Sequence, residues 1–225
     1  MSSRPTSLIV NIVLVLLLMG PPVAGAAPFA LIDHQRSVSA YQAGWNPYPP
    51  YEWLTASESV TASDAGPFNE SVFADLLDFD LGSAYARQTS TIGWWELSAS
   101  SGVFTDRLCA DTSNAMSYYM VLFELSGTTE VRIMGDVWEE EAAALVRLYE
   151  DGGGTVFEFC GALRESFDET HTLAPGTYRF TVHTESLGSS GFASANATLT
   201  AIPEPATLGL LALGACLPLF RRKSR

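Results

Sequence analysis

Several segments of the chain alternate between apolar and polar residues, and this period of two is typical of β-strands with one buried face. In the segment 177–184, Tyr178, Phe180 and Val182 alternate with polar neighbours. The same period recurs at two further sets of positions, which are Val131, Ile133, Val137 and Ala193, Ala195, Ala197, Leu199, Ala201. We therefore predict antiparallel strands whose apolar residues point into a core, with mostly small side chains on the last strand.

Two other features add strands to this pattern. Residues 117–125 (SYYMVLFEL) are apolar on both faces, which predicts a central strand between two layers. Residues 145–150 and 155–160 flank the three glycines at 152–154, so we predict that they pair as a hairpin. Gly135 interrupts its own apolar segment, and a β-bulge is the predicted reason.

Short strands with turn residues about every ten positions predict an all-β fold, an antiparallel β-sandwich of jelly-roll type. Residues 139–144 (EEEAAA) predict an acidic bend or a single turn of helix, and residues 75–81 (DLLDFDL) fit a short helix or a strand. Residues 41–53 hold five aromatic residues and three prolines, which is too irregular for a regular strand. We expect this stretch to be an extended ribbon over a sheet edge or an exposed aromatic platform.

The N-terminus has the features of a secretory signal peptide. Arg4 precedes an apolar run from Leu8 to Met19, and the small residues 24–26 follow it. This run is shorter than the roughly 20 residues that span a bilayer, so we favour a cleaved signal helix at residues 1–26 over an uncleaved anchor. The signal predicts one folded domain, residues 27–201, outside the cytoplasm.

The C-terminus has three features in a fixed order. Pro203-Glu204-Pro205 precedes the uncharged segment Ala206–Phe220, and a basic cluster follows. A helix of those 15 residues would be about 22 Å long, shorter than the roughly 30 Å hydrocarbon core, so it predicts a provisional transmembrane anchor. The cluster, which favours a cytoplasmic chain end, consists of Arg221, Arg222, Lys223 and Arg225.

This order of features resembles the PEP-CTERM sorting signal of bacterial envelope proteins, over residues 202–225. The resemblance implies recognition by a membrane protease-transpeptidase of the exosortase class, a transient membrane anchor, and a secreted or cell-envelope location. It also implies a link to exopolysaccharide, whose production commonly accompanies sorting in that family. Pro218 departs from a regular helix, and an ordinary anchor behind a chance Pro-Glu-Pro is the alternative.

Net charge limits the partners of the exported part. Without the two terminal signals, 7 of the 12 basic and 24 of the 25 acidic residues remain, which gives a net charge of −17 with histidine neutral. Such a surface repels nucleic acid and anionic lipid and attracts cations. We therefore exclude nucleic acid as a partner.

Cysteine usage fits an oxidising compartment. Of the three cysteines, Cys216 lies in the apolar C-terminal segment. Cys109 and Cys160 are therefore predicted to form a disulfide, with two free buried thiols as the alternative. Two cysteines without nearby histidines do not make a zinc site.

Aromatic residues are the candidate ligand contacts. Flat rings stack on the apolar faces of sugars, but large aromatic side chains more often fill a core or cover a sheet edge. Both interpretations stay open for Trp45, Tyr48, Tyr51 and Trp53, and for Trp94 and Trp95 further along the chain.

No catalytic or metal site is predicted, and no cofactor. The acidic candidates for Ca²⁺ match no complete calcium loop, and solvated carboxylates are the simpler interpretation of Asp33, Asp75, Asp78 and Asp80. The histidines have no ligand spacing, and His183 is expected to face solvent; they are His34, His171 and His183.

These observations predict a non-enzymatic, exported protein of the envelope or extracellular matrix with a structural or adhesive role. The alternative is a carbohydrate-binding module with an aromatic platform. A secreted hydrolase is less favoured, because no nucleophile or acid/base constellation emerges. Exposure of the tryptophan side chains separates the first two interpretations.

Overall fold

The protein is described by a computed structural model that covers residues 27–46, 48–49, 51–76, 82–107, 112–161, 164–188 and 190–203. These residues form strands and no helix. The strands are β1 (Ala30–Trp45), β2 (Trp53–Thr61), β3 (Phe68–Asp75), β4 (Gly82–Ile92), β5 (Glu96–Arg107), β6 (Thr112–Leu125), β7 (Thr129–Glu140), β8 (Ala143–Glu150), β9 (Thr155–Cys160), β10 (Glu165–Leu173), β11 (Gly176–Leu187) and β12 (Gly191–Ile202).

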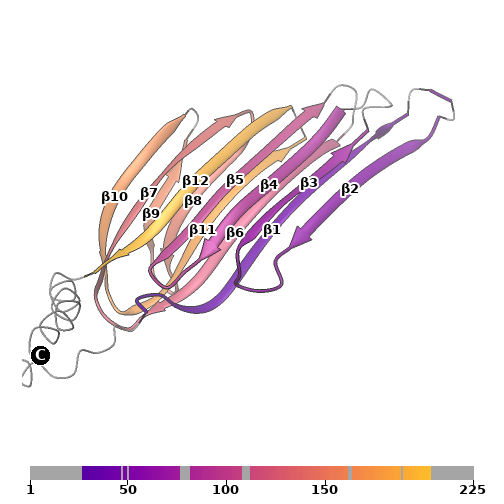
Figure 1. The fold of residues 1–225 in the computed structure, drawn as a ribbon. Helices are drawn as coiled ribbons and strands as arrows, with labels where there is room; N and C mark the ends of the chain where they lie inside the picture. Colours follow the sequence, from indigo (N-terminus) through magenta and orange to yellow (C-terminus); the bar gives the residue numbers. More distant parts are fainter. Residues whose placement is uncertain are drawn as a thin grey trace, which may run out of the picture. The chain divides into compact units, whose positions relative to one another are not determined.

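The strands form two antiparallel sheets of six strands each. Sheet A has the order β2-β1-β6-β11-β8-β9, and sheet B has the order β10-β7-β12-β5-β4-β3. The sheets face each other strand by strand: β1 contacts β3 and β4, β6 contacts β4 and β5, β11 contacts β5 and β12, and β8 contacts β12 and β7. Figure 1 shows the two layers side by side, from β10 and β9 across to β3 and β2. The predicted all-β class is confirmed, with 12 strands where a jelly roll has about eight.

The antiparallel registers define two ends of this sandwich. At one end, which we call the β1–β2 end, β1 stops at Trp45 and β2 starts at Trp53. At the other, the β4–β5 end, β4 turns into β5 around Trp94 and Trp95. Loops at both ends connect the strands, so any residue can be placed by its strand, its end and its face.

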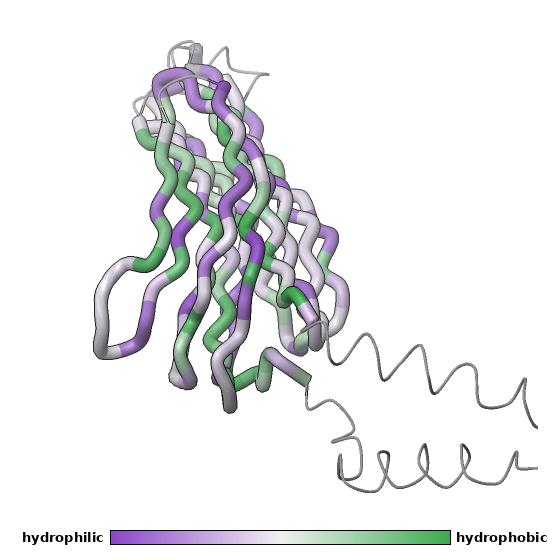
Figure 2. Tube along the Cα trace, turned by 90° about the vertical axis from the view of Figure 1, so that its left-hand side faces the viewer, coloured by the Kyte–Doolittle hydropathy of each residue, from purple (hydrophilic) through white to green (hydrophobic). Residues whose placement is uncertain are grey.

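Alternating side chains build the core between the sheets. On β11, the predicted inward residues Tyr178, Phe180 and Val182 are at most 2% exposed, and their neighbours point outward. The predicted inward residues of β7 and β12 are buried as well. Figure 2 shows hydrophilic and hydrophobic positions alternating along the strands. Burying one large aliphatic or aromatic side chain contributes about 1.5–3 kcal/mol, so this alternation is the main source of stability.

Three sequence expectations are resolved by the strands themselves. The segment 117–125 lies in β6, between β1 and β11, so its central place in the sheet is confirmed. It does not lie between two layers, because only one of its faces packs against the other sheet and Tyr118, Met120 and Leu122 on the outer face are half-buried. The predicted hairpin joins β8 and β9, with Gly152 at a φ of 83°. Of the two alternatives for 139–144, the acidic bend is confirmed, because the chain turns at Glu141 with a φ of 53° between β7 and β8.

Two expectations were wrong. The stretch 41–53 is partly regular, since β1 continues to Trp45 and β2 starts at Trp53. Gly135 is not a bulge: it pairs in regular register with Phe167 of β10 and with Ala197 of β12. The glycine is needed because a Cβ there would lie 2.0 Å from the backbone oxygen of Asn196 and 2.7 Å from the Phe167 ring.

Pro28–Ile202 form one compact unit. Residues 77–81, both predicted terminal helices and the basic cluster lie outside the described residues. Among the described residues, no helix is long and apolar enough to cross a bilayer.

We predict that Gly135→Ala destabilises the fold by about 3 kcal/mol, the upper end of the usual cost of overpacking, because backbone atoms cannot move aside as a side chain can. Denaturant unfolding measures the loss. Gly127→Ala is the matched control, since a Cβ at Gly127 meets nothing within 4 Å. Equal stability of the two variants would contradict this account of Gly135.

Candidate functional site

Five aromatic side chains are exposed at the β1–β2 end, on the outer face of sheet A and in the adjoining turn. Trp45 and Trp53 are direct cross-strand partners, and each is 52% exposed. Tyr48 and Tyr51 in the turn and Tyr41 on β1 are exposed too. We call these five residues the hairpin platform. Of the alternatives left open by the sequence, exposure of these rings is the one that the structure shows.

Backbone contacts hold this platform in place. The Asn46 N–H donates to the Glu52 carbonyl at 2.8 Å, and the Tyr48 N–H donates to Asn46 Oδ1 at 2.9 Å. Ala43, on the same outer face as Tyr41 and Trp45, is only 1% exposed, so its larger neighbours cover it. Three of the rings, Tyr41, Trp45 and Trp53, are therefore set on a strand pair, and the other two lie in the turn that joins the strands.

Trp94 and Trp95 do not join this platform. They lie at the β4–β5 end, where the Phe29 N–H donates to the Trp94 carbonyl at 3.3 Å and the Ala201 N–H donates to the Trp95 carbonyl at 2.9 Å. Phe29 precedes β1, a strand of 16 residues that ends at Trp45, so about 50 Å separates the two pairs of tryptophans. A single site cannot contain all four.

A shallow hollow of about 430 Å³ lies further along the outer face of sheet A, over β6, β11 and β8. Its lining mixes rings with two guanidinium groups, each paired with a carboxylate: Arg147 with Glu158 at 2.7 Å and Arg179 with Asp151 at 3.7 Å. The hollow is thus close to electrically neutral. Its residues are Tyr118, Leu145, Arg147, Tyr149, Arg179, Thr181 and His183.

Sheet B carries an aromatic row that the sequence interpretation missed. Cross-strand register brings together side chains from β3, β4, β5 and β12, and a fifth from β7 packs against the last of them. We call these five residues the aromatic row: Phe73, Tyr85, Phe104, Phe192 and Trp138. Three of them are exposed by 42–47%. They escape sequence reasoning because each is single within its own segment, and only strand pairing lines them up.

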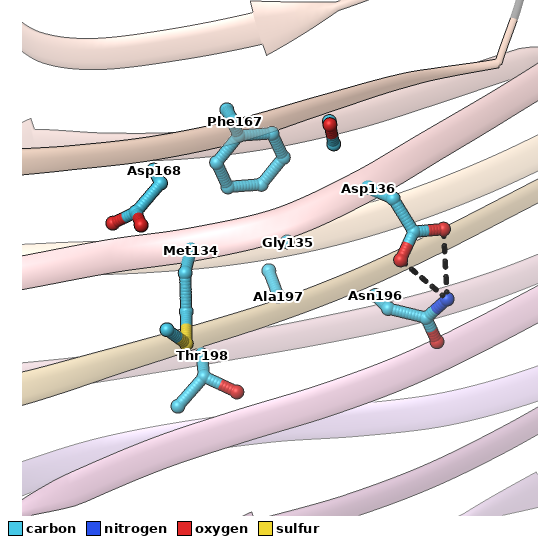
Figure 3. A pocket seen from close by; sticks show the side chains of 9 residues that line it. Met134, Gly135, Asp136, Phe167, Asp168, Asn196, Ala197 and Thr198 are labelled. Carbon is cyan, nitrogen blue, oxygen red and sulfur yellow. Dashed lines mark hydrogen bonds between the residues drawn. The ribbon is translucent and has the colours of Figure 1, made fainter.

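A second hollow, of about 470 Å³, lies on the same outer face over β10, β7 and β12. Figure 3 shows its polar side chains and the Asn196 amide that donates to both oxygens of Asp136. Asp168 accepts two hydrogen bonds from Arg132, at 2.7 and 2.5 Å, and hydrogen bonding to this guanidinium lowers the pKa of the Asp168 carboxyl. Both carboxylates of this hollow are therefore already engaged.

The predicted ionic and thiol candidates stay apart. Asp33 and Asp75 lie toward opposite ends of the sandwich, Asp78 and Asp80 are outside the described residues, and no group of three metal-binding side chains occurs among the described ones. Cys160 ends β9, is exposed, and has no disulfide partner within the described part of the chain. Cys109 lies outside that part, so the disulfide stays a prediction.

His183 is on the outward side of β11, as expected, but it is half-buried rather than facing open solvent. Its ring packs edge-on against Tyr118, with centroids 5.6 Å apart. Burial lowers the pKa of His183, opposed in part by the negative charge of Glu185. The imidazole is therefore held neutral in the folded state over more of the pH range than an exposed histidine.

Comparisons with known proteins leave the family open. No protein-family model and no curated protein matches this chain. Among solved structures, TmCBM61 in complex with β-1,4-galactotriose is similar over 52% of this chain and 88% of its own, with 12% identity and a TM-score of 0.32. The enzymatically active domain of tailspike protein 4 from bacteriophage CBA120 is similar over 53% of this chain and 19% of its own, with 14% identity and a TM-score of 0.27. At these scores neither similarity supports a functional conclusion.

We predict that His183 makes stability depend on pH. The unfolded histidine binds its proton near pH 6.5, whereas the folded one binds it only at lower pH. Between these values the unfolded state holds more protons, so stability falls as the pH drops below about 6.5. Melting temperatures should decrease more for the native protein than for His183→Gln between neutral and mildly acidic pH. If the melting temperatures of the native protein and His183→Gln decreased equally, His183 would not be the source of the pH dependence.

Proposed function

We propose that this protein is an exported carbohydrate-binding module that contacts a neutral polysaccharide through the hairpin platform. The observation that carries the proposal is the exposure of Trp45 and Trp53, paired side by side on one strand hairpin. A packing role predicts buried rings, and these are half exposed. Exposed rings on a rigid support are what stacking on sugar faces requires.

The platform has five rings, and their individually weak contacts with a glycan add up to a larger binding free energy. Stacking of one sugar on one ring contributes on the order of 1 kcal/mol, by analogy with aromatic pairs. Five rings on one hairpin therefore support binding to a polymer better than binding to a single sugar. Further along the same face, the hollow over β6, β11 and β8 contains two ion pairs, Arg147–Glu158 and Arg179–Asp151. These pairs offer donors and acceptors for the hydroxyl groups of a long polymer without a strong net charge.

Net charge favours a neutral polymer. At −17 for the exported part, an acidic polysaccharide is repelled at long range. A neutral glycan meets no such barrier. Binding, and not hydrolysis, fits the carboxylates of the sheet B hollow, since Arg132 and Asn196 already occupy them.

We predict that Trp45→Ala and Trp53→Ala each weaken polysaccharide binding about fivefold, the equivalent of roughly 1 kcal/mol. The measurement is a pull-down of the full chain on cellulose, chitin and insoluble β-1,3-glucan, with affinity electrophoresis in xylan, hydroxyethylcellulose and β-1,4-galactan. Trp94→Ala is the matched control, because Trp94 is equally aromatic, is 73% exposed and lies at the other end.

Two results would contradict the proposal that the hairpin platform binds a polysaccharide. One is the absence of binding to every glycan of the panel. The other is binding that survives both platform substitutions and disappears with EDTA, which would assign the contact to a calcium ion.

Delivery to the envelope belongs to the same proposal. The PEP-CTERM-like segment supports a transient anchor at Ala206–Phe220 that an exosortase-type protease removes near Pro203-Glu204-Pro205. The adhesive or structural role of the protein then follows from releasing a glycan-binding domain into an exopolysaccharide matrix.

We predict that Glu204→Ala leaves the protein in the membrane with its basic tail attached, because the protease loses its recognition residue. Mass spectrometry of the C-terminal peptide reads the outcome, with Ser224→Ala in the tail as control. Native protein from its own cells that still ends at Arg225 would contradict processing.

A further inference from the structure

We propose that the outer face of sheet B is a second polysaccharide-binding surface, and that the protein therefore cross-links two glycan chains. The inference rests on the proposed function of the hairpin platform and adds to it a separate site on the opposite face. Its elements are the aromatic row and the polar hollow next to it.

The aromatic row is continuous across the sheet. Phe73 pairs with Tyr85, Tyr85 with Phe104, and Phe104 with Phe192. Trp138 extends the row onto β7, with its ring centroid 4.8 Å from that of Phe192. Since neighbouring strands lie about 4.8 Å apart, five strands carry rings over about 19 Å, which is long enough to contact several consecutive sugar units.

The row is exposed although burial would stabilise it. Phe73, Phe104 and Trp138 are 47%, 43% and 42% exposed, and all five residues lie on strands and not on loops. Contiguous apolar surface of this kind on a soluble protein usually marks a binding site. Strand backbones also keep the rings in place, so a ligand does not have to order them.

The polar hollow adjoins the row through Trp138. Asp136 is two residues from Trp138 on β7, so both side chains point outward about 7 Å apart. The hollow offers the hydroxyl groups of Ser166 and Thr198 beside the Asn196–Asp136 pair, whose amide nitrogen and carboxylate are already bonded to each other. Rings beside hydrogen-bonding groups of both kinds match a sugar, which has apolar faces and a rim of hydroxyls.

Charge selects a neutral polymer over other occupants of this face. Asp75, Asp106 and Glu140 border the row on the side of the β1–β2 end, and the exported part has a net charge of −17. A second copy of this chain would bring like charges together, and an acidic polymer would be repelled. A neutral glycan avoids both penalties.

The positions of the two surfaces make them independent. Tyr41, Trp45 and Trp53 point away from the sandwich on sheet A, whereas the aromatic row points away on sheet B. One glycan chain cannot lie flat on both faces of a two-layer sandwich. Two chains bound at once are thereby bridged by a single molecule.

The test is a bridging assay with the full chain held on cellulose, chitin or insoluble β-1,3-glucan. Fluorescently labelled xylan, hydroxyethylcellulose or β-1,4-galactan is then added, and the label retained on the solid is measured. We expect the native protein and Trp94→Ala to retain label. The double variant Phe104→Ala/Trp138→Ala should reduce the retained label about 25-fold, equivalent to two stacking contacts, while its capture on the solid through the platform persists.

A second variant guards against misfolding. Phe73→Ser changes only the edge strand β3, and melting curves report whether each variant is folded. Retention of label that is unchanged by either variant overturns the cross-linking inference but leaves the platform proposal intact. A second result would also overturn the cross-linking inference and leave the platform proposal intact. In that result Trp45→Ala abolishes capture on the solid glycan, but the native protein retains no labelled glycan. Failure of the native protein to bind any of the glycans overturns both.

Discussion

Apolar contact between the inner faces of sheets A and B is the interaction on which the rest of this structure depends. Each strand contributes every second side chain to that contact, and residues such as Val121, Phe180 and Ile133 are completely buried there. Sheets of this length leave the remaining side chains outward on rigid backbone. The side chains on the outer faces are not constrained by the core, so the residue types found there indicate what the protein binds.

Small residues let the two layers fit together. β12 contributes alanines at 193, 195, 197 and 201 to the interior, all at most 3% exposed. Gly135 leaves room for the Phe167 ring, which continues into a cluster with Phe157 and Phe159 of β9 at the margin of the sandwich. Large rings thus close the margin near β9 and β10, while alanines occupy the interior beside β12. A methyl group added at Gly135 meets backbone, and for that reason the position tolerates little change.

The exposed aromatic residues on the outer faces are an exception, because large aromatic side chains are usually buried. On an acidic surface with a net charge of −17, solubility does not require further polar residues, so exposed rings are tolerated. The hairpin platform and the aromatic row occupy opposite faces, and a polar hollow adjoins the row. Weak contacts on two faces suit a matrix protein, because many such molecules bound to one polymer network gain strength from avidity.

Sequence pattern by itself determined the strand class, the β8–β9 hairpin, the central place of β6 and the buried face of β11, because each depends on local alternation or on a local turn. It also determined the PEP-CTERM resemblance and the net charge, which need no fold. Whether Trp45 and Trp53 are exposed was decided only by the tertiary structure, because exposure depends on whether other strands cover them. The aromatic row and its polar hollow were likewise beyond sequence reasoning: Phe73, Tyr85, Phe104 and Phe192 become neighbours through cross-strand register, and register is set by pairing between segments that are far apart in the chain.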